Sequence, residues 1–172
     1  PATPEGSFSS IENTTPSSSL IRNAIFGSFQ DYIVAPVGFG CTTNCGTISY
    51  YTIGTAPFRK TIINFNGLNY FNCTGLDARK AYFQLVLSET TNEIDVNVQD
   101  KPLPCLGNSS ANGNGNSLIG LNNADGTIGV AAPGRNTSEF AVTNESYKFT
   151  PSGASATTVV WTNQFGVSLG NS

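Results

Sequence analysis

The 172-residue chain has no histidine and no methionine, and only 11% of its residues are charged. Without histidine, the chain cannot form a mixed Cys/His zinc site, and it lacks the usual base of a serine hydrolase. Eight Lys and Arg residues stand against eleven Asp and Glu residues, which leaves a net charge of −3. So few cations do not make the basic stripe that nucleic-acid binding requires, and we expect no nucleic-acid partner.

Long apolar runs are also missing. No stretch approaches the roughly 20 apolar residues that cross a bilayer, so we expect no membrane span. A signal peptide and an initiator methionine are both absent, from which we expect a processed chain or a piece of a longer one. Hydrophobic residues still make up 38% of the chain, which is enough for a folded domain with an ordinary core.

The clearest structural pattern runs from Ala81 to Gln99. This stretch contains two segments in which every second residue is apolar, so each segment has one apolar face. The apolar residues are Phe83, Leu85 and Leu87 in the first segment, and Ile94, Val96 and Val98 in the second. A polar break over residues 89–92 separates the segments. Period-two alternation on both sides of a polar break predicts a half-buried β-hairpin. One apolar face is not stable alone, so the rest of the chain must cover it.

Further short segments also predict strands. They are residues 46–54, 58–66, 117–121, 128–132 and 147–149, the last ended by Pro151, with a short strand or helical turn over 20–26. We expect a connection over 67–80 and loops over 107–117 and 133–137. No segment has convincing helical spacing. We therefore predict an all-β fold, an antiparallel β-sandwich, over residues 20–152.

Composition divides the chain into three parts. Residues 1–19 are rich in Ser, Thr and Pro and are interpreted as a tether or edge segment. After a boundary near residue 152, residues 153–172 contain a strand with Trp161, a turn and a returning strand. This pattern predicts the opening strands of a second, truncated Ig-like domain.

The four cysteines are Cys41, Cys45, Cys73 and Cys105. A zinc site built on cysteine needs close pairs at both ends, and only the first two cysteines are close, so disulfides in an oxidising compartment are favoured. Three connectivities are open, and we favour Cys41–Cys45 with Cys73–Cys105. The second bond closes the longer loop and would stabilise the fold by about 3–4 kcal/mol in the chain-entropy model.

No catalytic constellation is evident. Glu93 and Asp95 share the outer strand face, with side chains about 6.6–7 Å apart, which is the separation found in inverting glycosidases. A solvated sheet face is the favoured interpretation, ahead of calcium ligation and of a glycosidase pair. The turn over residues 122–126 also offers oxygen ligands for Ca²⁺, but an ordinary Asp-Gly hairpin turn is favoured there.

Aromatic side chains offer a second hypothesis, a platform for sugar binding. The candidates are Tyr50, Tyr51, Tyr70, Phe71, Tyr147 and Trp161. Tyr50 and Tyr51 are adjacent in a predicted strand and must point to opposite faces, so we expect at least one of them to be exposed. Filling of the core is the favoured role for the set as a whole.

Several motifs occur together in a fixed order. They are NAIFG at residues 23–27, IGTAP at 53–57, LSETTNEID at 87–95, IGLNNADGT at 119–127, APGRNT at 132–137 and TNESYKFTP at 143–151. This series resembles the nidogen-like modules of large Bacteroidetes cell-surface proteins, including gliding-motility adhesins exported by the type IX secretion system. The resemblance implies a Cys73–Cys105 disulfide, neighbouring Ig-like domains and a place on the bacterial cell surface.

Together these patterns predict a non-enzymatic structural and adhesive module of a cell-surface adhesin, involved in gliding motility or surface attachment. Its partner would be an extracellular surface or a glycan. The alternative is a carbohydrate-binding module of a secreted protein. We expect no cofactor, with Ca²⁺ left open.

Overall fold

The computed structural model describes residues 13–34, 46–71, 79–104, 116–152, 160–163 and 168–171. These ranges contain strands and no helix. The strands are β1 (Ala24–Phe29), β2 (Tyr32–Ile33), β3 (Thr47–Ile53), β4 (Lys60–Tyr70), β5 (Lys80–Ser88), β6 (Ile94–Lys101), β7 (Asn116–Asn122), β8 (Gly129–Glu139), β9 (Val142–Ser152), β10 (Val160–Asn163) and β11 (Ser168–Asn171).

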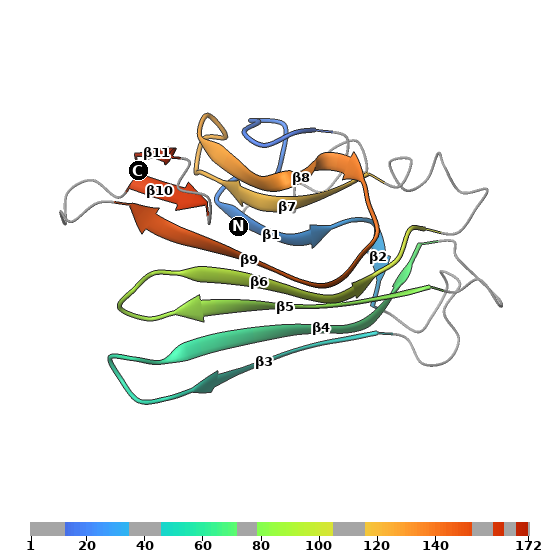
Figure 1. Ribbon diagram of the computed structural model, residues 1–172, viewed down its shortest axis with the longest axis horizontal. Helices are drawn as coiled ribbons and strands as arrows, with labels where there is room; N and C mark the ends of the chain where they lie inside the picture. The colour runs from blue at the N-terminus through green and yellow to red at the C-terminus, as the bar shows by residue number, and fades with distance from the viewer. Residues whose placement is uncertain are drawn as a thin grey trace, which may run out of the picture.

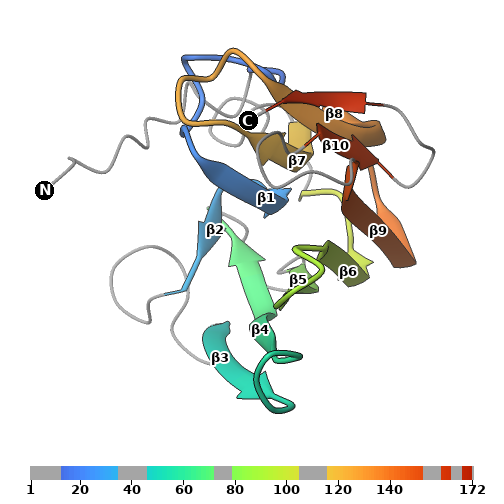
Figure 2. The same cartoon turned by 90° about the vertical axis from the view of Figure 1, so that its left-hand side faces the viewer.

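The strands form two antiparallel sheets that pack face to face, which confirms the predicted β-sandwich (Figure 1). The small sheet has the order β1-β7-β8. The large sheet has the order β11-β10-β9-β6-β5-β4, and β4 carries both β2 and β3. Seen from one end, the large sheet curls around the small one and leaves β3 far from it (Figure 2). The small sheet therefore covers only part of the inner face.

The predicted hairpin is confirmed at the centre of the large sheet. β5 and β6 pair antiparallel with Leu85 opposite Val96, and these side chains are only 6% and 0% exposed. Ser88 N–H donates to the carbonyl of Glu93 and closes the turn at 2.9 Å. The apolar face of the hairpin packs against the small sheet, where Ile119 of β7 and Ala132 of β8 are buried in the same cluster.

The chain near Pro133 is a strand, where we expected a loop. β8 runs through Pro133 and Gly134 because the ladder is bulged: Ala131 lies opposite Gly120, and the next paired residue, Asn136, lies opposite Leu118. The extra residues leave the ladder, so the missing N–H of proline breaks no ladder hydrogen bond. Gly134 takes a φ of +68° in this excursion.

Two strands are also longer than the sequence patterns indicated. β4 continues to Tyr70 because Gly67, with φ +68°, forms a bulge between Asn66 and Leu68 that restores pairing with β5. β9 reaches Ser152 although it contains Pro151. Its pairing with β6 ends at Phe149, so beyond this point β9 pairs only with β10. Pro151 has no backbone N–H, and this is tolerated because the side of β9 away from β10 has no partner strand there.

Residues near the start of the described chain pack onto the small sheet. Thr15 N–H donates to the side-chain oxygen of Asn136 at 2.8 Å, and the Asn136 amide donates back to the Thr15 carbonyl at 2.9 Å. The Thr15 hydroxyl donates to the Leu121 carbonyl at 2.8 Å. Residues 20–23 lead into β1 without a helical turn, and Leu20 is buried against Phe26 and Leu118.

The last two strands extend the large sheet. β10 pairs with β9 through Trp161 opposite Pro151, and β11 pairs with β10. The Ig-like domain expected over 153–172 is not shown by these strands, and the boundary near residue 152 stays a prediction. All four cysteines, and most of the loop expected over 107–117, lie outside the described residues.

Candidate functional site: an amide-lined groove

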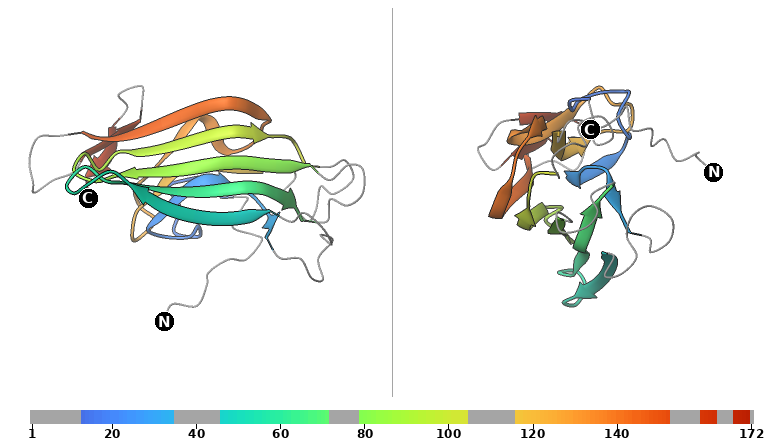
Figure 3. Two further views of the ribbon diagram at one scale, coloured as in Figure 1. Left: turned by 90° about the horizontal axis from the view of Figure 1, so that it is seen from below. Right: turned by 90° about the vertical axis from the view of Figure 1, so that its right-hand side faces the viewer.

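The outer face of the large sheet is the broadest regular surface of the protein. β9, β6, β5, β4 and β3 lie side by side across it (Figure 3, left). Strand register sets its composition, because residues directly opposite each other in antiparallel strands share one face. Alternate residues of each strand therefore form rows that run across the sheet.

One row consists of amide and hydroxyl side chains from four strands. Asn64, Gln84, Asn97 and Ser146 lie opposite one another in turn. Gln84 donates to the Asn64 side-chain oxygen at 2.7 Å, Asn97 donates to that of Gln84 at 3.4 Å, and Ser146 donates to that of Asn97 at 2.9 Å. Each primary amide has two N–H donors and two acceptor lone pairs, so this row keeps hydrogen-bonding capacity for a ligand.

The row forms part of the floor of an open groove of about 520 Å³. The groove is lined further by Asn66, Tyr82, Gln99 and Asn144 at one end and by Ser49 on β3. Glu145 is the one ionisable carboxylate in this lining. A concave surface rich in amides and hydroxyls, with an aromatic ring beside them, suits an uncharged ligand that both donates and accepts hydrogen bonds.

The next row along the strands carries a carboxylate pair. Lys148 Nζ lies 3.2 Å from Glu93 Oε2 and 3.5 Å from Asp95 Oδ1, so one ammonium bridges both predicted candidates. These two salt bridges raise the pKa of Lys148, and the hydrogen bond that its ammonium donates to Glu93 makes the largest contribution. The lysine occupies the space between the carboxylates where an inverting glycosidase holds its water, which favours the solvated-face interpretation.

The predicted Asp-Gly turn is confirmed between β7 and β8. The Asp125 carboxylate accepts from the backbone N–H and the hydroxyl of Thr127 at 3.0 and 2.6 Å, and these bonds lower its pKa. Gly126 takes a φ of +76° there. The carboxylate therefore stabilises its own turn. Within the described ranges, no group of three or more Asp, Glu, His or Cys side chains is placed to hold a metal ion.

Four of the candidate aromatic residues form an exposed pair and a buried pair, and a fifth, Phe71, is partly buried. Tyr50 and Tyr51 are both exposed, at 79% and 45%, which confirms the expectation for this pair. Tyr70 and Tyr147 are buried and fill the core. The side chain of Trp161 lies outside the described residues.

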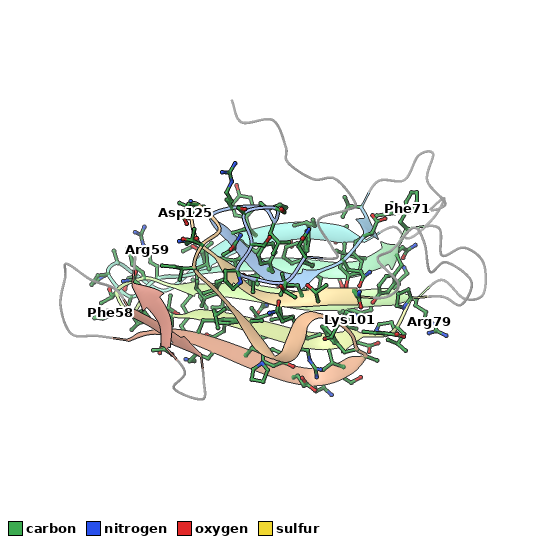
Figure 4. All side chains as sticks on the ribbon, turned by 90° about the horizontal axis from the view of Figure 1, so that it is seen from above. Phe58, Arg59, Phe71, Arg79, Lys101 and Asp125 are labelled. Carbon is green, nitrogen blue, oxygen red and sulfur yellow. The ribbon has the colours of Figure 1, made fainter. Side chains whose placement is uncertain are left out.

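The disulfide prediction rests on residues that the structure does not describe, but the chain on either side of two of them is described. Phe71 precedes Cys73 closely, and Pro104 immediately precedes Cys105. The Tyr70 hydroxyl donates to the Pro102 carbonyl, and Arg79 donates to the Leu103 carbonyl at 3.1 Å. Phe71 and Arg79 lie at the same end of the sandwich, opposite Phe58 and Arg59 (Figure 4).

Sequence reasoning missed Lys101, which is completely buried at the end of β6. Its ammonium donates to the Phe140 carbonyl at 2.8 Å and lies 4.3 Å from the centre of the Phe140 ring. Burial, followed by the charge of Arg135, lowers its pKa to about 8. Because Lys101 lies in the polar run before Pro102, nothing in the sequence distinguishes it from an exposed lysine.

Within the described ranges there is no helix of the length and hydrophobicity needed to cross a membrane.

Comparison with known proteins identifies the family. No curated protein and no solved structure matches the chain. The family model described as NIDO related, however, matches residues 3–163. This match includes strands β1 to β10, and the chain therefore belongs to the NIDO-related, nidogen-like family.

Proposed function

We propose that this chain is a non-enzymatic structural and adhesive module of a bacterial cell-surface adhesin that acts in gliding motility or surface attachment. The amide-lined groove on the outer face is the observation that carries the proposal. It offers a large hydrogen-bonding surface of mostly uncharged side chains on a well-paired sheet. The NIDO-related family supports an extracellular setting.

The proposed mechanism has two parts. The long ladders of β4, β5, β6 and β9 hold the shape of the sheet face and resist its distortion, since every central strand is paired on both sides. The groove then contacts the substratum through many weak hydrogen bonds, each of which exchanges with water and contributes little alone. Several such modules in one adhesin would multiply this weak attachment through effective concentration.

Adhesion under flow tests the proposal. Beads coated with the protein should remain on glass or on a polysaccharide gel at flow rates that remove beads coated with albumin. The Gln84→Ala/Asn97→Ala variant, which removes the middle of the amide row, should lower retention. The Thr55→Ala variant, which removes an exposed hydroxyl from the β3–β4 turn, should not. Equal retention of all three proteins would reject the groove as the adhesive surface.

A carbohydrate-binding module is the second candidate. The specific observation in its favour is Tyr82 beside the amide row, since sugar rings stack on aromatic faces while amides bind their hydroxyl groups. A glycan array with the same variants separates the two proposals. Binding of a defined soluble glycan that the Gln84→Ala/Asn97→Ala change abolishes would favour the module, and adhesion without any soluble binder would favour general attachment.

A further inference from the structure

Strand β3 is an unprotected sheet edge. It pairs with β4 on one side, and among the described residues no strand pairs with its other side. All seven of its residues are exposed. Figure 1 shows it as the outermost strand, and Figure 2 shows that the small sheet does not extend over it.

The edge lacks the features that normally prevent strand pairing. Natural edge strands carry charges, proline or bulges, or are very short. β3 reads Thr-Ile-Ser-Tyr-Tyr-Thr-Ile, without a charge or a proline, and its register with β4 has no bulge. Both faces carry large exposed apolar side chains: Ile48 and Tyr50 are 51% and 79% exposed on the inner face, and Tyr51 and Ile53 are 45% and 49% exposed on the outer face.

The nearest charges do not protect the edge either. Arg59, in the turn that follows β3, holds the Glu89 carboxylate through two side-chain bonds of 2.9 and 2.6 Å. Lys60 lies on β4 opposite Ile53 and is therefore one strand away from the free edge. Because β3 itself carries no charge, there is no electrostatic repulsion between the β3 edges of two copies.

We propose that β3 pairs antiparallel with β3 of a second copy of this chain, across a two-fold axis through Tyr50. The sequence of the strand favours this partner. All seven residues of the strand are paired only in the register that places Tyr50 of one copy opposite Tyr50 of the other. In this register the inner faces of the two large sheets lie on the same side. It places Tyr50 beside Tyr50 and Ile48 beside Thr52 on the inner face, with Ser49 beside Tyr51 and Thr47 beside Ile53 on the outer face.

These are favourable cross-strand neighbours. Aromatic pairs and pairs of aromatic or β-branched residues stabilise antiparallel sheets, and no like charges meet. The two-fold arrangement is also closed: each copy uses its single β3 edge once, so the pairing ends at the dimer and does not grow into a fibre. Among the described strands, the small sheet lies over other parts of the large sheet and does not extend over the β3 edge.

A charge-swap experiment tests the proposal. Sedimentation velocity of the wild-type protein over a concentration series should show a reversible dimer. Tyr50→Lys and Tyr50→Glu should each weaken the dimer at least about tenfold, because residue 50 opposes itself and two like charges then meet. An equimolar mixture of the two variants should restore the dimer, since Lys then faces Glu. Phe58→Lys places the same charge on an exposed aromatic position outside the ladder and should leave dimerisation unchanged.

Several results would overturn the inference. They are a wild-type protein that stays monomeric at its highest soluble concentration, dimers that persist in both Tyr50 variants, and a mixture that fails to restore pairing. Circular dichroism of each variant checks that the sheet is intact. Restoration by mixing cannot arise from unfolded variants, so a folding defect would not imitate the expected result.

Discussion

Lys101 is the residue whose environment departs furthest from its sequence context. Among the described residues its ammonium makes no salt bridge, and burying such a charge costs free energy that the Phe140 carbonyl and the Phe140 ring offset only in part. This cost is the reason that the pKa of the Lys101 ammonium is lowered to about 8. The folded protein therefore releases this proton at a lower pH than the unfolded chain.

We predict that Lys101 makes the protein more stable at alkaline pH. Below about pH 8 both states hold the proton, and between about 8 and the ordinary value of 10.5 only the unfolded state does, so stability rises with pH in that window. Urea unfolding at pH 7 and at pH 9, below the range in which tyrosines ionise, should show a gain of about 1 kcal/mol in the wild type. Lys101→Met should lose this dependence, and an equal pH slope in both proteins would contradict the buried charge.

Asp31 should show the opposite behaviour on the acidic side. Burial raises the pKa of its carboxyl to about 6, so the folded state takes up a proton before the unfolded chain does. The contribution of Asp31 to stability therefore grows as the pH falls from 7 to 5, by at most about 1 kcal/mol. Asp31→Asn should remove this gain. Unfolding curves of the two proteins that stay parallel across this range would exclude a raised pKa.

At the scale of elements, the β5–β6 hairpin carries the core. Leu85 lies between Ile63 of β4 and Val96 of β6 and faces β1, where a side chain added at Gly27 would come within 2.9 Å of it. We predict that Leu85→Ala lowers the free energy of unfolding by about 2–5 kcal/mol, because it leaves a cavity in a closely packed site. Gln99→Ala, on the exposed face of β6, should change it by less than about 0.5 kcal/mol. Similar urea midpoints for both variants would contradict this placement of the core.

The sequence predicted the elements whose signal is local. Strict alternation located β3, β5 and β6, because a half-buried strand needs only its own side chains to show its period. It failed at Pro133, Pro151 and Gly67, where a strand continues because its partner permits a bulge or has already ended. Those conditions depend on the neighbouring strand, so they cannot be detected in the sequence pattern of the strand itself.

The groove was hidden for a related reason. The sequence shows Gln84 and Asn97 as outward-facing residues of one hairpin, but the row also needs Asn64 and Ser146 in register. The pairing of β6 with β9 joins segments separated by β7 and β8, so no short-range pattern reveals it. Alternation predicted that at least one of Tyr50 and Tyr51 is exposed, whereas the exposure of both faces of β3 depends on how far the small sheet extends.

At the scale of the whole molecule, the predicted Cys73–Cys105 disulfide would decide how the protein bears force. It would join the chain after β4 to the chain after β6, at the end of the sandwich where Tyr70 and Arg79 already bind the carbonyls of Pro102 and Leu103. These contacts hold the two flanking segments near each other. The disulfide would therefore close the β5–β6 hairpin into one covalent loop that tension cannot extend.

Single-molecule unfolding measures that loop directly. The 32 residue steps from Cys73 to Cys105 correspond to roughly 115 Å of extended chain, which the intact disulfide would hide. Cys73→Ser should lengthen the contour released on unfolding by this amount. Cys41→Ser should lengthen it by only about 14 Å, because the loop between Cys41 and Cys45 has four residue steps. The two other connectivities place Cys41 in a long loop, so a large increase in the Cys41→Ser variant would reject the predicted pairing, and no increase in either variant would show that both bonds are absent.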